Sequence, residues 1–226
     1  MPPFDLYGGR DPRHIPLYAQ REAAHIVGVS HSTLRSWVQE QTDSEGMMPP
    51  LIRRPDEADS RLSFSNLVEA FVLRALRERY RVPMKAIRQA VAYAEAELDV
   101  KHLLLRRELR VSGDLFWDRL GQLINLSQSG QLAIRHVLES YLERIEWDEQ
   151  TNLPTRFFPL PDAGVATKSV VVDPRVAFGH PTLSGTGIST EVVKRRIDIG
   201  ETVEELAEDY QVSIKQVKDA LLYERP

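Results

Sequence analysis

Cysteine is absent from this 226-residue sequence. The absence excludes disulfides, thiolate zinc sites and a cysteine nucleophile, and it is typical of proteins in a reducing cytosol. Long hydrophobic runs are also missing, since the longest apolar stretches, such as residues 103–105 and 170–172, span only a few positions. The first ten residues lack the basic-then-apolar pattern of a signal peptide. We therefore expect a cytoplasmic protein with no membrane span.

An excess of positive charge is lacking as well, because the formal net charge is -4 at pH 7. That value excludes a protein that coats nucleic acid through bulk charge. The charge is slightly uneven: residues 20–88 hold eleven basic and nine acidic residues, whereas residues 165–226 hold eight and ten. With 42% hydrophobic and 27% charged residues the composition is that of a globular protein, long enough for two compact units or three small ones.

Patterns typical of enzymes and metal sites are missing too. The six histidines are scattered, and only His136 and Glu139, three residues apart on an expected helix, give a weak metal-binding pattern. No nucleophile elbow or P-loop is present, and the glycine-rich residues 179–188 lack the Lys-Ser/Thr ending of a phosphate loop. We therefore expect no enzyme activity, no cofactor and no metal.

The first structural pattern is a helix-turn-helix. After a Pro- and Gly-rich arm that reaches His14, residues 20–27 predict a short helix that ends at Gly28. Ser30 is a suitable N-cap for a second helix that runs to about Val38. In that helix Leu34 and Trp37 fall on one side, which leaves polar side chains toward solvent for phosphates or base edges.

Basic residues follow this pattern. Residues 51–54 and 61–64 flank the acidic stretch 55–60 and predict a β-hairpin, or wing, that carries Arg53, Arg54 and Arg61. Asn66, with Glu69 three residues on, predicts the start of the next helix, and Pro83 predicts the start of another. The candidate DNA-binding residues are Ser30, His31, Ser32, Thr33, Arg35, Ser36, Arg53, Arg54 and Arg61.

Three segments resemble the MerR family in the family's own order: residues 23–37 its helix-turn-helix, residues 61–65 its passage from wing to helix, and residues 82–87 the entry to its next helix. The resemblance implies a winged helix-turn-helix over residues 14–98 that binds double-stranded DNA at a palindromic site as a homodimer. After Leu98 the sequence departs from the family, whose long dimer-forming helix is interrupted here. The metal-sensing cysteines of the family are also absent.

Residues 99–163 predict a middle α+β unit. Residues 103–105, 109–111 and 115–117 suggest strands around the turn residue Gly113, residues 131–147 an amphipathic helix, and residues 156–160 an edge strand. Our hypothesis is that this unit supplies the dimer contact through Phe116, Trp117 and the helix.

Residues 164–226 predict a strand at 169–172 and three helices at 190–199, 203–210 and 213–223, of which the last two are arranged like a helix-turn-helix. Residues 170–174, 179–188 and 200–213 resemble a small antitoxin-type domain found beside PIN-like ribonuclease toxins, as in VapB-type antitoxins. Gly187 stands where that family commonly has arginine. The resemblance implies a toxin-binding surface, with the candidate residues Phe178, His180, Thr182, Gly185, Thr186 and Ile188.

Together these patterns predict a mainly α protein with small β elements: an N-terminal winged helix-turn-helix, an α+β middle unit and a C-terminal three-helix domain. The functional hypothesis is an antitoxin of a type II toxin-antitoxin system that binds a PIN-like ribonuclease toxin and represses its own promoter. The alternatives are a stand-alone MerR-like regulator that senses a small molecule, and a scaffolding protein.

Overall fold

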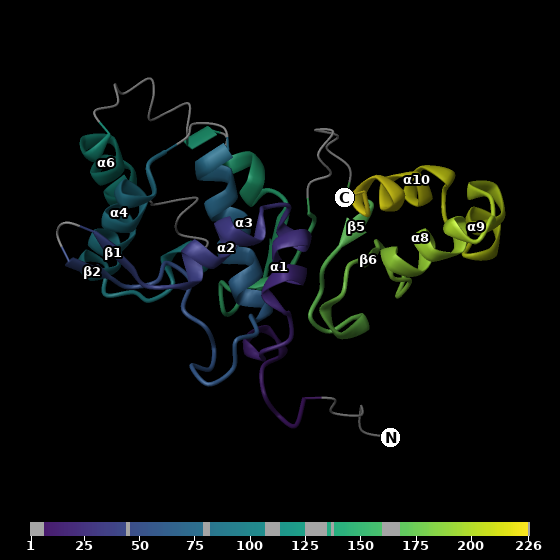
Figure 1. The fold of residues 1–226 in the computed structure, drawn as a ribbon, viewed down its shortest axis with the longest axis horizontal. Coiled ribbons are helices and arrows are strands. Elements are labelled where there is room, and N and C mark those ends of the chain that lie inside the picture. Colours follow the sequence, from purple (N-terminus) through teal and green to yellow (C-terminus); the bar gives the residue numbers. More distant parts are fainter. Residues whose placement is uncertain are drawn as a thin grey trace.

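The computed structural model describes residues 7–43, 46–78, 82–106, 114–124, 135–136, 138–159 and 168–225. Within these ranges the protein is mainly helical, with three small antiparallel sheets of two strands each. Figure 1 shows two bodies, a larger N-terminal one that ends after strand β4 and a smaller C-terminal one that contains helices α8 to α10. The predicted class, mainly α with small β elements, is confirmed.

The N-terminal body begins with the predicted helix-turn-helix, α1 (Gln20–Val27) and α2 (His31–Val38). Helix α1 ends at Gly28, whose φ of 74° is a left-handed conformation that glycine adopts without a Cβ clash. The Oγ of Ser30 accepts a hydrogen bond from the backbone N–H of Thr33 at 3.1 Å and caps α2. Both helices turn their apolar faces into the same core.

The centre of that core is α3 (Phe64–Glu78), which is buried on all sides between Phe64 and Leu76. The helix begins two residues before the predicted start at Asn66, because the Oγ of Ser63 accepts a hydrogen bond from the backbone N–H of Asn66 at 3.3 Å. Arg74, itself buried, donates a hydrogen bond to the carbonyl oxygen of Val27 at 2.7 Å and joins α3 to the end of α1.

The predicted hairpin at residues 51–54 and 61–64 is wrong. The hairpin instead follows α2 directly and consists of β1 (Gln41–Asp43) and β2 (Gly46–Met48). Residues 49–63 form a loop, in which Leu62 alone makes a β-bridge, to Tyr18. Prolines at 49, 50 and 55 remove backbone donors that a ladder needs. Asp56 and Asp59 accept hydrogen bonds from the backbone two residues on and hold turns instead.

The middle segment is more helical than the sequence suggests. After α4 (Met84–Glu97) come the 3-10 helix η2 (Leu103–Leu105) and α6 (Asp114–Leu123), where strands are predicted; the predicted strand at 109–111 lies outside the described residues. Phe116, Trp117 and Leu120 recur at helical spacing, and α6 packs along α4. Short apolar runs do not distinguish strand from helix, which accounts for the error.

The segment ends in a small sheet. Residues 138–142 are helical, as predicted, but the helix does not continue to Trp147, because β3 (Ile145–Trp147) pairs with β4 (Pro154–Phe157). Phe157 packs against Phe71 of α3, with their ring centroids 5.2 Å apart. The described part of residues 99–163 thus packs into one hydrophobic cluster with the helix-turn-helix, and the boundary drawn at residue 98 does not separate two cores.

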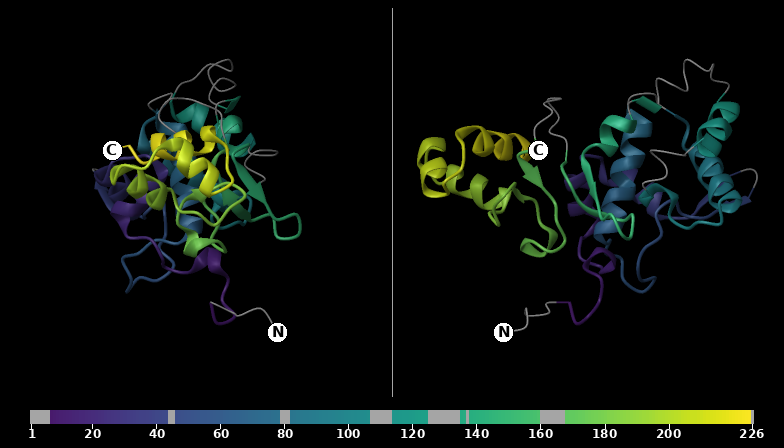
Figure 2. Two further views of the ribbon diagram at one scale, coloured as in Figure 1. Left: turned by 90° about the vertical axis from the view of Figure 1, so that its right-hand side faces the viewer. Right: turned by 180° about the vertical axis from the view of Figure 1, so that it is seen from behind.

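The C-terminal body is a second, smaller core. Strands β5 (Val170–Val171) and β6 (Thr182–Leu183) flank the 3-10 helix η3 (Ala177–Gly179), and three helices follow, α8 (Thr190–Asp198), α9 (Val203–Asp209) and α10 (Ile214–Tyr223). These helices confirm the prediction to within one residue at every end. Capping boxes start two of them, Thr202 with Glu205 for α9 and Ser213 with Gln216 for α10. Figure 2 shows this body from two further directions.

Candidate DNA-binding surface and its contact with the C-terminal domain

Helix α2 presents the polar side chains expected of a helix that reads DNA. His31, Ser32 and Arg35 are exposed, whereas Leu34 and Trp37 are buried beneath them. The Nε of Arg35 donates a hydrogen bond to Gln39 at 3.2 Å, and this exposed contact is weak enough to exchange for a base or phosphate. The structure therefore brings three of the predicted side chains together on one open face.

The remaining hydroxyl groups of α2 are partly engaged. The Oγ of Ser30 lies 2.8 Å from the Oγ1 of Thr33, in addition to capping the helix. Ser36 donates to the carbonyl oxygen of Thr33 at 2.7 Å. Ser30, Thr33 and Ser36 thus stabilise the first turns of the helix through local hydrogen bonds, and His31, Ser32 and Arg35 remain as its outward side chains.

The three arginines predicted for a basic wing lie on the loop 49–63. Arg53 is 3.8 Å from the carboxylate of Glu95, and Arg54 donates to the carbonyl oxygen of Asp59 at 3.1 Å. Arg61 binds the carboxylate of Asp59 at 2.7 Å, and its hydrogen bonds hold the pKa of Asp59 below its usual range. The charge of Arg61 is therefore already neutralised in part.

The hairpin that does follow α2 has a different character. Residues 39–48 contain no lysine or arginine and hold three acidic residues, Glu40, Asp43 and Glu45. Met47, at 71% exposure, stands out from strand β2. The structure therefore corrects the prediction that the hairpin carries the arginines. They lie on the loop after the hairpin, where prolines and aspartates prevent regular strand pairing.

A buried arginine that the sequence did not single out positions this region. Arg88 of α4 donates to the carbonyl oxygen of Ser36 at 2.8 Å and also to that of Pro49. Burial lowers its pKa from the ordinary value, but two charge-assisted hydrogen bonds compensate for much of the lost hydration. Arg88 thereby joins the end of α2 to the start of the loop 49–63, which we call the arginine loop because it carries Arg53, Arg54 and Arg61. Arg88 and Ser36 are 52 residues apart in the sequence, so no local pattern predicts their contact.

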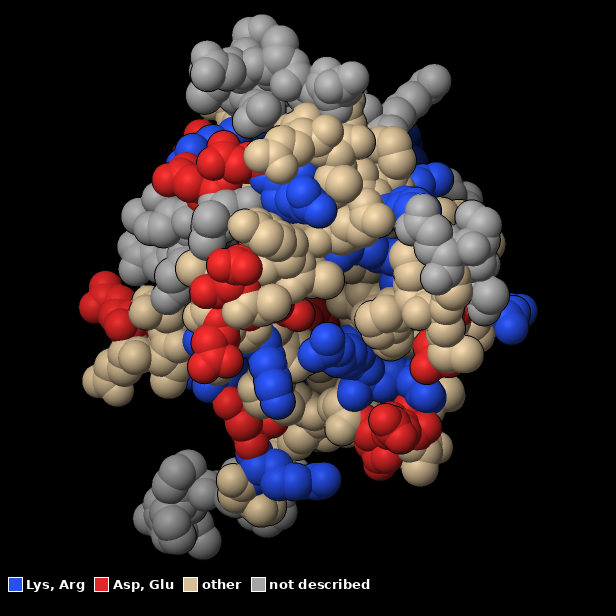
Figure 3. Space-filling view, turned by 90° about the vertical axis from the view of Figure 1, so that its left-hand side faces the viewer, with Lys and Arg blue, Asp and Glu red and all other residues tan. Residues whose placement is uncertain are grey.

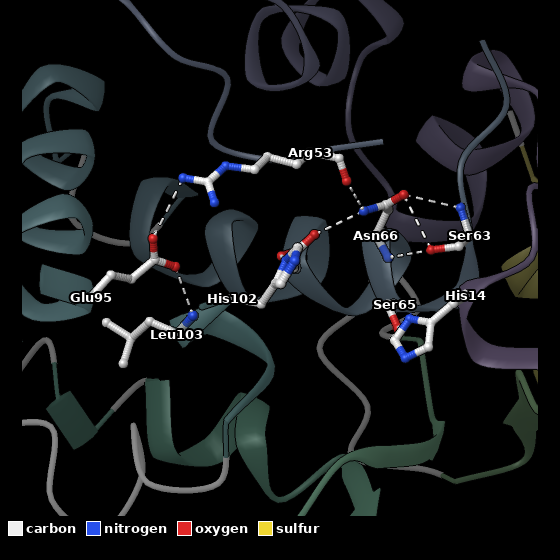
Figure 4. A network of polar contacts seen from close by, with 9 residues as sticks. His14, Arg53, Ser63, Ser65, Asn66, Glu95, His102 and Leu103 are labelled. Atoms are coloured by element: carbon white, nitrogen blue, oxygen red, sulfur yellow. Dashed lines mark hydrogen bonds and ion pairs between the residues drawn. The ribbon is translucent and has the colours of Figure 1, made fainter. Parts of the chain in front are cut away.

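A second network lies behind the arginine loop (Figure 4). Glu69 of α3 is almost fully buried, and its two carboxylate oxygens accept hydrogen bonds from Asn66 and from the Nδ1 of His102, each at 2.9 Å. The bond to Glu69 raises the pKa of His102. Asn66 also donates to the carbonyl oxygen of Arg53 at 2.9 Å. The network fixes the backbone from which Arg53 projects.

The residues predicted to bind a toxin do not form a single surface. Phe178 and Gly185 are exposed, and Phe178 has an unusual positive φ of 53°. His180 faces α1, and Thr182 is completely buried in β6. Thr182 therefore holds the strand pair and is not available to a partner. Thr186 and Ile188 form the turn after β6, where Thr186 Oγ1 donates to Leu183 O at 2.9 Å and accepts from the Ile188 N–H.

Phe116 and Trp117, expected at a dimer contact, are also buried. Phe116 has no exposed surface and Trp117 has 5%. Their rings stack edge to face 4.9 Å apart within the cluster that α6 shares with α4. The structure corrects this expectation, because side chains in the core of one chain cannot make the contact to another.

The C-terminal domain docks on the first helix of the helix-turn-helix. The Nδ1 of His180 lies 3.0 Å from a carboxylate oxygen of Glu22, and the ring of Tyr223 lies 5.6 Å from that of His25 on α1. Just before α1, the hydroxyl of Tyr18 is buried and donates to the carbonyl oxygen of Gly179 at 2.9 Å. Helix α1 therefore contacts α2 on one side and the C-terminal domain on another.

No cluster of three or more histidine and acidic side chains that could hold a metal ion occurs in the described part of the chain. In the weak metal-binding pattern of the sequence, the Nδ1 of His136 lies 3.7 Å from a carboxylate oxygen of Glu139.

None of the described helices is both long and apolar enough to cross a bilayer.

Comparison with known proteins also distinguishes an N-terminal and a C-terminal segment. Residues 16–91 match the family model described as "Putative DNA-binding HTH domain", and residues 170–223 match "Protein of unknown function (DUF433)". A solved structure, the X-ray crystal structure of Rv2018 from Mycobacterium tuberculosis, superposes with a TM-score of 0.70 at 29% identity and covers 92% of this chain and 98% of that chain.

Two relatives from Mycobacterium tuberculosis strain H37Rv are similar over most of their length. One, named "Putative antitoxin VapB45", is 29% identical over 92% of this chain and 93% of its own. The other, "Uncharacterized protein Rv2308", is 25% identical over 92% of this chain and 89% of its own. The chain thus contains an N-terminal segment that matches a helix-turn-helix DNA-binding model and a C-terminal segment that matches DUF433, and over 92% of its length it is similar to the protein named "Putative antitoxin VapB45".

Proposed function

We propose that this protein is the antitoxin of a type II toxin-antitoxin system, with no catalytic activity of its own. The observation that carries the proposal is the similarity over 92% of the chain to a protein named as an antitoxin, together with the open polar face of α2. The N-terminal body binds its own promoter as a MerR-like winged helix-turn-helix. The C-terminal domain binds a PIN-like ribonuclease toxin in the cytoplasm.

In this proposal the protein contacts DNA through His31, Ser32 and Arg35 of α2, with Arg53 and Arg54 on the flanking backbone. The site is a palindrome, and the protein acts as a homodimer. Because Phe116 and Trp117 are buried, the dimer contact uses other, exposed side chains. Sedimentation at micromolar concentration tests the dimer, and a monomer at that concentration contradicts it.

The toxin contact is proposed at Phe178, which is 57% exposed on η3. Large exposed aromatic side chains are frequent anchors of protein interfaces. The position is favourable for regulation, because Gly179 and His180 next to it contact Tyr18 and Glu22. A toxin seated on Phe178 therefore touches the same loop that the helix-turn-helix holds.

Co-expression tests the proposal. The adjacent reading frame, if it encodes a PIN-like acidic cluster, is expected to arrest growth alone and to be harmless when this protein is present, and the two proteins should co-purify. Phe178→Ala should lose co-purification. Ile199→Ala is the matched control, since Ile199 is 75% exposed on the same domain and away from η3. Equal capture by wild type and Phe178→Ala contradicts the contact, and growth arrest that persists contradicts the antitoxin function.

A further inference from the structure

A hollow opens between the arginine loop and α4. Its cavity volume is about 150 Å³, which is about the volume of a cavity that holds one aromatic ring, and it is partly open to solvent. Figure 3 looks at the face of the molecule formed by β1–β2, α4 and α6, where lysine and arginine side chains, with acidic side chains between them, lie around the hollowed centre. The hollow lies beside the DNA-binding surface and is distinct from the C-terminal domain that is proposed to bind the toxin.

The walls of the hollow are apolar. Residues from the end of β2 and the loop after it form one wall, and α4 forms the opposite one. The apolar lining residues are Met48, Pro49, Pro50, Leu51, Val91 and Ala92. The apolar rings of Pro49 and Pro50 and the side chains of Val91 and Ala92 suit the apolar body of an organic ligand.

One end of the hollow carries an arginine with unused hydrogen-bond donors. Among the described residues the acidic partner of the Arg53 guanidinium is Glu95, at 3.8 Å, which is too long for a hydrogen bond. Glu95 itself accepts a hydrogen bond from the backbone N–H of Leu103 at 2.9 Å. Arg53 is half exposed and can turn its planar fork toward a ligand. A carboxylate or sulfonate matches that fork.

The other charged groups of the lining are already satisfied. Arg88 is held by two carbonyl oxygens, and Glu69 is held by Asn66 and His102. Arg53 is therefore the basic group of the lining whose guanidinium forms no hydrogen bond among the described residues. A guanidinium of this kind favours an acidic group with one negative charge.

We propose that this hollow binds a small organic monoanion, with its apolar body between the prolines and α4 and its acidic group on Arg53. Binding there is linked to DNA binding in two ways: Arg53 is also proposed to contact the DNA backbone, so the ligand and the DNA compete for it, and Arg88 contacts both Pro49 in the wall and Ser36 at the end of α2. Because linkage is reciprocal, a monoanion that alters DNA affinity must have its own affinity altered by DNA to the same extent.

The test is a fluorescence titration of the full chain with 8-anilinonaphthalene-1-sulfonate, an aromatic monoanion. Arg53→Gln should weaken binding at least tenfold. Arg54→Gln is the matched control, because Arg54 is the neighbouring arginine and does not line the hollow. Ala92→Trp fills the hollow from an exposed helix position without changing any charge, and it should abolish binding. Urea midpoints equal to wild type establish that each variant is folded.

Four outcomes of this titration would overturn the proposal. Binding that is unchanged in Arg53→Gln denies the role of the arginine, and binding that is unchanged in Ala92→Trp places the dye elsewhere. The neutral analogue N-phenyl-1-naphthylamine should bind at least tenfold more weakly than the sulfonate, and equal affinity contradicts recognition of the charge. If neither the sulfonate nor 1-naphthoate binds to the wild type, no monoanion site exists there.

Discussion

The turn of the helix-turn-helix offers the sharpest test of how the fold is held together. Gly28 has a φ of 74°, and a Cβ built on it would lie 2.2 Å from the Nη1 of Arg74. The left-handed conformation alone costs a residue with a side chain about 1–2 kcal/mol. The guanidinium must also move, which breaks its 2.7 Å hydrogen bond to Val27 O, and a buried bond of this charged kind contributes about 1.5–3 kcal/mol.

Gly28→Ala should therefore destabilise the protein by about 2.5–5 kcal/mol, adding the two costs. For a slope of about 2 kcal/mol per molar urea, the midpoint should fall by about 1–2.5 M. Circular dichroism in urea measures the shift. Gly185→Ala is the control, because Gly185 has a φ of 80° but nothing within 4 Å of the added Cβ, so only the conformational cost remains.

A double-mutant cycle isolates the contribution of the arginine. In an Arg74→Met background the collision with the guanidinium is gone, and Gly28→Ala should then cost only about 1–2 kcal/mol. The reasoning is refuted if Gly28→Ala costs less than about 1 kcal/mol in the wild type, or if its cost is the same in both backgrounds.

Three further predictions concern DNA, pH and the domain contact. Arg35→Ala should cost about 1–3 kcal/mol on the specific site, whereas Arg54→Ala should weaken all sequences alike and flatten the salt dependence; titrations at several salt concentrations check this, and identical curves for both variants contradict it. His102 has a raised pKa in the folded protein, so its contribution to stability is complete below its unfolded pKa of about 6.5 and is lost as the pH rises through the folded value. Urea midpoints between pH 6 and 9 should fall more steeply for wild type than for His102→Gln, and parallel profiles disprove it. Gly179→Ala would place a Cβ 2.0 Å from the hydroxyl of Tyr18 and should raise proteolysis between the domains; a rate equal to wild type rules out that packing.

The C-terminal helices could be predicted from the sequence because their ends are encoded locally. Thr202 with Glu205 and Ser213 with Gln216 are capping boxes that need only residues three apart. Gly200, with a φ of 106°, lies just after α8 and ends it. The helix-turn-helix was predictable for the same reason, since Gly28 and Ser30 mark its turn. Where local signals agree with tertiary packing, sequence reasoning succeeds.

The elements and site residues that sequence reasoning missed depend on contacts between distant residues. Arg88 and Ser36 are 52 residues apart, and His102 and Glu69 are 33 apart, so no periodicity reveals them. The hairpin prediction was wrong because residues 51–54 and 61–64, which flank the acidic stretch 55–60, were given more weight than the prolines beside them. Phe116 and Trp117 resembled a strand because a short apolar run fits either a strand or a helix, and only the packing of α6 on α4 decides.

Residues 170–172, which include β5, contribute side chains to the cores of both domains. Val170 is buried in the C-terminal core and pairs with Leu183, whereas Val172, two residues on, is buried in the N-terminal core and pairs with Phe157. A chain that ends before Val170 loses the burial of Val172 in the N-terminal core, which is worth about 1.5–3 kcal/mol. A chain that begins after Val172 loses the burial of Val170 in the C-terminal core, at a similar cost. The two domains therefore share the segment 170–172, and we expect them to unfold in a single thermal transition.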